Sequence, residues 1–352
     1  MPGILSIGWY LPQRRRSVAE IAARTGIAQS TLVDFGVVSQ TAPGERDHPA
    51  GMAAAAARHA LDAAGLSAEE VDLVIFCGMT HDYPSPWVTA FGVMHELGAA
   101  QANGFDLSAR CPGLLDALWV AAQLIAAGSH RTALVCTGDR FDHLLGPPRV
   151  PNVVGEAMYS AGGAAAVVSR QADNELVAFT HNTNKQLELH SQNIPRAGGT
   201  RMPLTGEALD SGLHRWQSGM TLPQLATVVS FMRTADRRNL DALRRLSGFE
   251  EIDFFVCSPI DVHGQAAALA ELGLDPVTQT LFTIPVFGHM GPADALVSLA
   301  AAIAEGRRVG PRLVLAARSV ISSNAIAVRG KREDLGIRVT GSPLDEIHGA
   351  PP

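Results

Sequence analysis

Two residues with reactive side chains stand where the sequence pattern predicts that a helix begins. Cys111 lies in FDLSARCPGLLDALWVAAQLIAAG (105–128), where a strand-like end leads through a proline and a glycine into a long apolar helix. His289 lies in IPVFGHMGPADALVSL (284–299), where a strand end, a glycine and a proline again precede an apolar helix. A thiol and an imidazole are groups that enzymes use as nucleophile and general base.

The N-terminus of a helix suits both side chains. Its first turn has unpaired N–H groups and a positive partial charge, which stabilise a thiolate. Pro112 fixes the entry into the helix without loss of a needed N–H, and Gly113 leaves room for a substrate chain. We expect His289 to take the proton from Cys111 and later to hand it on. We also expect the positive partial charge at the helix N-terminus to keep the imidazole of His289 neutral.

The composition limits the class of protein. The chain has 352 residues, a formal net charge of -6 and 18% charged residues, so we expect a globular protein and no nucleic acid as a partner. Its 4 cysteines form no C-x-x-C pair and its 12 histidines show no ligand spacing, so we expect no metal site. We place Cys77, Cys136 and Cys257 in the core.

Motifs for a nucleotide or another permanently bound cofactor are not found in the sequence. No stretch resembles a signal peptide, and no apolar run reaches the roughly 20 residues that span a bilayer. We therefore expect a cytoplasmic protein without membrane contact.

Helices and strands alternate along the chain, which predicts the α/β class. The first half is predicted to contain helices and strands at 53–66, 71–78, 114–128, 132–138 and 162–170. Three blocks of the second half repeat this order, at 240–258, 293–317 and 324–330.

This repeat indicates an internal duplication. Gly128 corresponds to Gly306, and the same offset carries Cys111 onto His289. We predict an N-terminal half at 1–173 that carries the nucleophile and a C-terminal half at 174–330 that carries the histidine. A tail at 331–352 is predicted to be disordered.

The segment DLSARCPGLLDAL (106–118) resembles the active-site cysteine segment of β-ketoacyl-ACP synthase III, a thiolase-fold condensing enzyme. Other blocks that resemble this family are ARTGI (23–27), GMTHDYPSP (78–86), MYSAGGAAAVV (158–168) and VFGHMGPADA (286–295). The resemblance implies a five-layered α-β-α-β-α fold, a homodimer, and an acyl group loaded on Cys111. It also implies acyl-CoA or acyl-ACP as the co-substrate, with an acyl carrier protein as a possible partner.

The chain departs from this family at the catalytic positions. The histidine of the family's HQAN motif falls on Ser258, and the asparagine of its HGN motif falls on His289. Cys111, His289 and Asp261 would form a nucleophile–base–orienter chain, which suits attack by a hydroxyl or an amine on a thioester. Asp261 is alternatively a surface residue or a helix N-cap, and nearby His263 is either a pocket residue or a structural one.

Two further positions are transferred from the resemblance. The backbone N–H groups of Cys111 and Val320 would bind the developing oxyanion. Trp87 lies in a region that in the family reaches across the dimer and walls the acyl pocket, and the alternative is a core or interface tryptophan.

Our first hypothesis is an acyltransferase that passes an acyl group from Cys111 to a small-molecule hydroxyl or amine, with a malonyl-type group as one candidate for the acyl group. Family members with this exchange resemble tailoring enzymes of polyketide and antibiotic biosynthesis. The alternatives are a decarboxylative condensing β-ketoacyl synthase III and a non-catalytic partner subunit.

Overall fold

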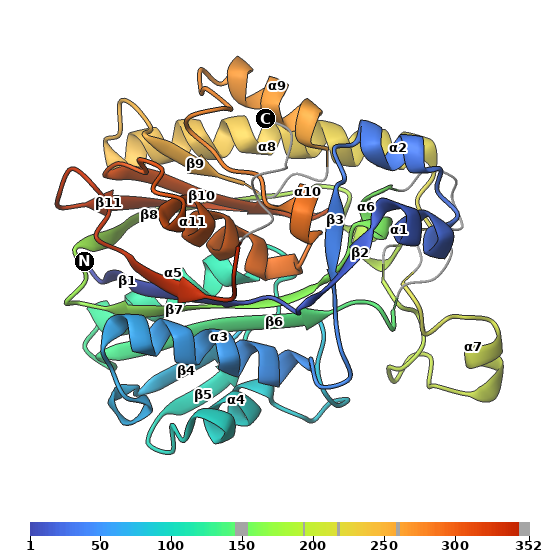
Figure 1. Ribbon diagram of the computed structural model, residues 1–352, viewed down its shortest axis with the longest axis horizontal. Helices are drawn as coiled ribbons and strands as arrows, with labels where there is room; N and C mark the ends of the chain where they lie inside the picture. The colour runs from blue at the N-terminus through green and yellow to red at the C-terminus, as the bar shows by residue number, and fades with distance from the viewer. Residues whose placement is uncertain (145–153, 193, 217–218, 258–260, 345–352) are drawn as a thin grey trace.

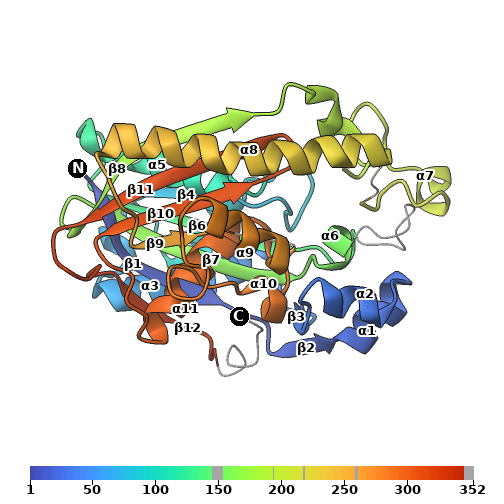
Figure 2. The ribbon, with the colours of Figure 1, turned by 90° about the horizontal axis from the view of Figure 1, so that it is seen from above.

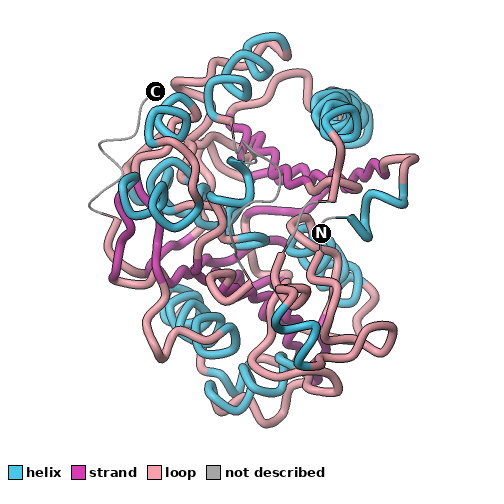
Figure 3. Tube along the Cα trace, turned by 90° about the vertical axis from the view of Figure 1, so that its right-hand side faces the viewer, coloured by secondary structure: helices cyan, strands magenta, loops and turns pink. Residues whose placement is uncertain are grey.

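The computed structural model describes residues 1–144, 154–192, 194–216, 219–257 and 261–344. Five layers are stacked in it, with helices on both outer sides and between two sheets (Figure 1). The end-on view in Figure 3 shows the same stack, in which strand layers alternate with helix layers. The predicted five-layered thiolase-like arrangement of two duplicated halves is therefore confirmed.

Each half contributes strands in an equivalent order. The sheet of the first half runs in the order β5 (Asn103–Asp106), β4 (Leu73–Phe76), β6 (Thr132–Arg140), β7 (Ala161–Ser169) and β1 (Gly3–Tyr10). The second half runs in the order β9 (Phe254–Val256), β10 (Arg312–Arg318), β11 (Ser322–Gly330) and β8 (Asn174–Thr183), and β8 pairs with β1 at Gly3 and Glu175, so the sheets of the two halves are joined there. β4–β6 and β9–β10 are parallel, whereas β6–β7 and β10–β11 are antiparallel, so the halves repeat one pattern. The division between residues 173 and 174 stays a prediction.

Outer helices cover one face of each sheet. α3 (Pro49–Ala64) and α4 (Thr89–Leu97) cover the first sheet, and α8 (Leu222–Ser247) and α9 (Val262–Glu271) cover the second (Figure 1). Figure 2 shows α8 running along the whole second sheet. α3 lies directly on the strands because Gly8 and Gly138 have no side chain. An added Cβ at these two positions would come within 2.1 and 2.2 Å of backbone oxygens of α3 or its first turn.

The middle layer consists of α5 (Gly113–Ala126) and α11 (Asp294–Ala304). α5 contacts strands of both sheets, and α11 does the same. Residues 294–302 of α11 are all buried, as expected for a helix that is covered on every side. These two helices follow Cys111 and His289, so the middle layer brings the two predicted helix mouths together.

Smaller elements complete the chain. They are β2 (Arg14–Ser17), β3 (Ser39–Ala42), α1 (Val18–Thr25), α2 (Gln29–Asp34), α6 (Val154–Ala157), α7 (Gly206–Asp210), α10 (Ile284–Phe287) and three 3₁₀ turns at Ala68–Glu70, Leu187–Gln192 and Gly291–Ala293. None of the helices in the described part of the chain has the length and apolar character needed to cross a membrane.

The prediction of a disordered tail over 331–352 is wrong in its first part. Residues Arg338–Gly341 form β12, which pairs in parallel with β1. Ser342 extends this contact, since its carbonyl accepts from Trp9 Nε1 at 2.8 Å and its hydroxyl accepts from the Leu11 N–H at 2.9 Å. The strand has only four residues, which is too short for a clear sequence pattern. Residues 345–352 lie outside the described part.

Candidate active site

Cys111 stands at the turn between β5 and α5, and 5% of its surface is exposed. Arg110 directly before it has φ 59°, and among the described residues it is the one non-glycine with positive φ. Such backbone conformations are costly and cluster at functional sites. The turn is closed by the Gly113 N–H, which donates to the Arg110 carbonyl at 2.9 Å.

His289 is held between α10 and α11 by backbone bonds to the segment just before β7. Its N–H donates to the Met158 carbonyl at 2.7 Å, and its carbonyl accepts from the Ser160 N–H at 3.0 Å. Gly288 before it has φ 77°, and a Cβ there would lie 2.7 Å from that of Ser160. Only glycine fits this approach, so the backbone of His289 has little freedom.

The two predicted residues meet in the structure. Cys111 Sγ lies 3.4 Å from His289 Nε2, and both side chains are buried. On the other side of the ring, His289 Nδ1 lies 2.5 Å from Asp294 Oδ2. The second oxygen of Asp294 accepts from the Met290 N–H at 2.8 Å, which fixes the carboxylate. A thiol, an imidazole and a carboxylate therefore form one continuous chain.

The prediction that Asp261 orients the imidazole is wrong. Asp261 is exposed and caps α9, where its side chain accepts from the Gly264 N–H at 2.9 Å. His263 is also exposed on α9. The sequence did contain a signal for Asp294. The duplication that aligns Cys111 with His289 also aligns an aspartate of the first half, Asp116, with Asp294.

The charges around His289 favour its protonated form. Burial alone would lower the pKa of the imidazole, but the charges of Asp294 and Cys111 outweigh burial and hold this pKa well above its ordinary value. Our expectation of a neutral imidazole is therefore wrong for the protein without a bound acyl group. The arrangement favours the imidazolium form of His289 beside Cys111 Sγ, with Asp294 accepting a hydrogen bond from Nδ1–H.

Val320 and Trp87 are not brought to this chain by any described contact. Val320 lies half-buried between β10 and β11, where its carbonyl accepts from Asn184 Nδ2 at 3.3 Å. Trp87 is 37% exposed, and its ring meets that of Tyr83 edge-on at 5.1 Å. Ser258 lies outside the described residues. The oxyanion role of Cys111 and Val320 stays a prediction.

An aromatic cluster that the sequence did not reveal covers the imidazole. The Tyr159 ring lies 4.9 Å from the His289 ring, and Trp216 lies 5.2 Å from Tyr159. Arg110 lies over the Trp216 ring at 5.5 Å, and Phe141 completes the cluster. Tyr159 belongs to MYSAGGAAAVV, one of the blocks that carries the family resemblance. The cluster excludes water from one side of the pair.

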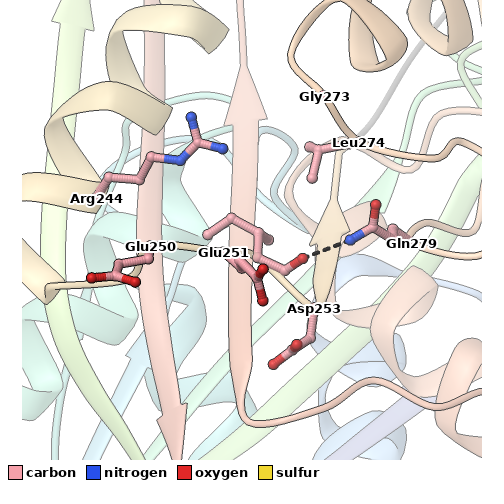
Figure 4. A pocket seen from close by; sticks show the side chains of 8 residues that line it. Arg244, Glu250, Glu251, Asp253, Gly273, Leu274 and Gln279 are labelled. Atoms are coloured by element: carbon pink, nitrogen blue, oxygen red, sulfur yellow. Dashed lines mark hydrogen bonds between the residues drawn. The ribbon is translucent and has the colours of Figure 1, made fainter.

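A separate cavity of about 310 Å³ is lined by none of Cys111, His289 and Asp294 (Figure 4). Its lining comes from the segment before β9 and from its neighbours, namely Arg244, Glu250, Glu251, Ile252, Asp253, Gly273, Leu274 and Gln279. Cys111 instead follows the carboxyl end of β5, whereas the cavity is lined by Ile252 and Asp253, which directly precede β9, so the cavity lies at the opposite end of the strands. No group of three His, Cys, Asp or Glu side chains is placed to hold a metal within the described ranges.

The comparisons with known proteins agree with the geometry. The family model of 3-oxoacyl-[acyl-carrier-protein (ACP)] synthase III matches residues 105–185, which include the nucleophile turn and α5. The β-ketoacyl-[acyl-carrier-protein] synthase III of Clostridioides difficile (strain 630) is 25% identical over 329 residues, covering 89% of this chain and 93% of that protein. The chain is therefore similar to synthase III over most of its length.

Further similarities extend this relationship. An acetoacetyl CoA synthase of Streptomyces sp. (strain CL190) is 28% identical over 334 residues, covering 89% of this chain and 93% of that protein. The crystal structure of the synthase III from Pseudomonas aeruginosa PAO1 superposes with a TM-score of 0.78 at 23% identity, covering 94% of this chain and 98% of that one. The chain therefore has the fold of that synthase III over nearly its whole length.

Proposed function

We propose that this chain is an acyltransferase that loads an acyl group from a CoA or ACP thioester onto Cys111 and passes it to a hydroxyl or amine of a small molecule. The observation that carries the proposal is the buried chain in which Cys111 Sγ lies 3.4 Å from His289 Nε2 and His289 Nδ1 lies 2.5 Å from Asp294. An acyl transfer needs a nucleophile, a proton carrier and a group that orients the carrier. Cys111, His289 and Asp294 supply these three groups in that order.

In the first half-reaction the Cys111 thiolate attacks the carbonyl carbon of the donor thioester. The carbon–sulfur bond to the donor then breaks, and the departing thiolate takes its proton from the His289 imidazolium. The products are acyl-Cys111, the free thiol of the donor and a neutral imidazole. Asp294 accepts the hydrogen bond from Nδ1–H throughout and takes no proton itself.

In the second half-reaction the neutral His289 accepts the proton of the acceptor hydroxyl or amine through Nε2. The acceptor oxygen or nitrogen attacks the acyl carbon, and the Cys111 thiolate leaves. The thiolate–imidazolium pair is thereby restored. Burial of the pair beneath Tyr159 limits the access of water, so hydrolysis of the acyl group should be slow relative to transfer.

A heteroatom acceptor fits this arrangement better than a carbon acceptor. In synthase III a histidine and an asparagine stabilise the enolate that forms when a malonyl donor loses carbon dioxide. Here the asparagine position carries the imidazole of His289, which Asp294 prepares for proton transfer, and Asp261 and His263 are exposed on α9. The donors that an enolate oxygen needs are not assembled around Cys111 in the described part of the chain.

Decarboxylative carbon–carbon condensation is the second candidate. It is favoured by the relatives, which are named as synthases III and as an acetoacetyl CoA synthase. The third possibility, a non-catalytic partner subunit, is disfavoured by the contact between Cys111 and His289. A homodimer, a carrier-protein partner, a cytoplasmic location and a place in polyketide metabolism remain predictions.

Intact-mass analysis after incubation with a panel of acyl-CoA compounds tests the proposal. We expect an acyl adduct on the wild type, no adduct on Cys111→Ala, and slow formation and loss of the adduct on His289→Ala. Asp261→Asn is the matched control for Asp294→Asn and should behave as the wild type. A malonyl adduct that keeps its full mass supports heteroatom transfer, whereas release of carbon dioxide with chain extension supports condensation.

A further inference from the structure

A second buried carboxylate, Asp139, lies at the end of β6. It is fully buried, with 0% of its surface exposed. Its Oδ1 accepts three hydrogen bonds, from the Met79 N–H at 2.8 Å, the Thr80 N–H at 2.7 Å and the Thr80 hydroxyl at 2.8 Å. The Thr80 hydroxyl in turn accepts from the Arg140 N–H at 3.0 Å. Asp139 therefore fixes the turn that follows β4.

This turn forms one side of the nucleophile site. Met79 Sδ lies 3.6 Å from Cys111 Sγ, so a displacement of the turn would change the surroundings of the sulfur. On the other side, a Cβ at Gly291 would lie 3.2 Å from Asp139 Oδ2 and 3.5 Å from Met79 Sδ. Asp139 thus lies between the turn that touches Cys111 and the segment that directly follows His289.

The second oxygen of this carboxylate is not used. Oδ2 is buried and has no hydrogen-bond partner among the described residues. A buried polar atom without a partner is costly, and such atoms call for an explanation. Burial raises the pKa of Asp139 to about 7, even though the bonds from Thr80 and Met79 and the charge of His289 act in the opposite direction. The carboxyl group therefore changes charge in the range in which enzymes work.

The titratable groups around Asp139 come from three elements. His289 faces it from the loop before α11, and its charge lowers the pKa of Asp139. Cys77 faces it from the end of β4, where burial raises the pKa of the thiol, with Cys136 and Asp139 adding to the rise. Cys111 is linked to Asp139 through Met79, whose N–H donates to Asp139 and whose Sδ lies 3.6 Å from Cys111 Sγ. Of these, His289 is the group whose charge matters for acyl transfer.

We propose that Asp139 is a positioning residue of the acyl-transfer site, which holds the Met79–Thr80 turn against the sulfur of Cys111 and sets the charge felt by His289. This inference rests on the proposed function. In acyl-Cys111 the thiolate charge is gone, and His289 must be neutral to accept a proton. An ionised Asp139 favours the imidazolium, so it moves the onset of transfer to higher pH.

Loss of an acetyl adduct from Cys111 in buffer, with water as the acceptor, tests this inference. The adduct is formed with acetyl-CoA, the excess is removed, and its decay is followed by intact mass from pH 5.5 to pH 9. We expect the rising limb of the decay rate in Asp139→Asn to lie at a pH lower than in the wild type by about half a unit or more. Asp142→Asn, which removes a carboxylate three residues further along the chain, is the matched control and should leave the limb in place.

Coincident limbs for Asp139→Asn and the wild type would overturn the inference. If Asp139→Asn does not fold, Thr80→Val takes its place. It removes one donor to the carboxylate and should shift the limb in the same direction by a smaller amount. If no acetyl adduct forms on the wild type, the proposed function fails. The role of Asp139 is then tested by the pH profile of the rate at which iodoacetamide alkylates Cys111. An inflection near neutral pH in the wild type that is missing in Asp139→Asn supports its role, and identical profiles refute it.

Discussion

Asp139 should make the free energy of unfolding depend on pH. This effect can be measured without an activity assay. The pKa of this carboxyl is raised by burial from the ordinary 3.8 to about 7. Between these values the unfolded chain binds fewer protons at this site than the folded one. Asp139 therefore contributes stability that is fully present below about pH 4 and is lost as the pH rises through 7.

The size of this effect follows from the shift. One pKa unit corresponds to about 1.4 kcal/mol, so the whole shift corresponds to roughly 4 kcal/mol, of which roughly 3 kcal/mol falls between pH 5 and pH 8. Full burial of the group means that no discount for solvent screening applies. Asp139→Asn removes the titration and leaves the shape. Its amide also adds donors without partners, at a cost of about 1 to 3 kcal/mol that does not vary with pH.

Urea unfolding followed by circular dichroism at pH 5 and pH 8 measures the difference. We expect the free energy of unfolding of Asp139→Asn, relative to the wild type, to be more favourable at pH 8 than at pH 5 by roughly 3 kcal/mol. Asp142→Asn should show no comparable change, because Asp142 is only half-buried. A relative stability of Asp139→Asn that is equal at both pH values would refute the reasoning, since the carboxyl would then titrate alike in the folded and unfolded chains.

Three further predictions concern the site itself. Asp294→Asn should slow acylation of the nucleophile by about 100-fold or more, because His289 loses the group that holds its Nδ1 proton, while Asp261→Asn should not. Stopped-flow acylation checks this, and equal rates for the two variants would contradict it. Trp216→Ala should raise hydrolysis of the acyl group relative to its transfer, because the aromatic cluster no longer excludes water. Mass spectrometry measures the ratio of the two products, and a ratio equal to that of the wild type would contradict this role of the cluster. Gly288→Ala should destabilise the fold by about 2 kcal/mol or more, visible as a lower melting temperature, since φ 77° disfavours a side chain and an added Cβ would lie 2.7 Å from that of Ser160.

The repeated pattern made the main elements and the pair Cys111–His289 predictable from the sequence. Buried strands and apolar helices have clear periodicities, and a duplication doubles the evidence for each. Asp294 was missed because an aspartate in the first turn of a helix is common for reasons of the helix dipole alone. Asp261 was preferred because it aligns near the family's lost histidine, but the alignment could not reveal that its side chain turns back to cap α9.

Two other features had no usable signal. Asp139 ends a strand in TGDR, which resembles a strand that leaves the core, and only the packing of β4 and the His289 loop against it makes the position buried. The short strand β12 depends on its pairing with β1, from the far end of the chain. Long-range packing decides both cases, and local sequence does not encode it.

The middle layer has a consequence for how such a protein can be taken apart. α5 and α11 each touch strands of both sheets, and each is preceded by one member of the pair. A fragment that ends after β7 would keep the sulfur, lose the ring and expose an apolar helix to water, and the complementary fragment would suffer the reverse. A gene split between the halves should therefore regain a site only when both products assemble.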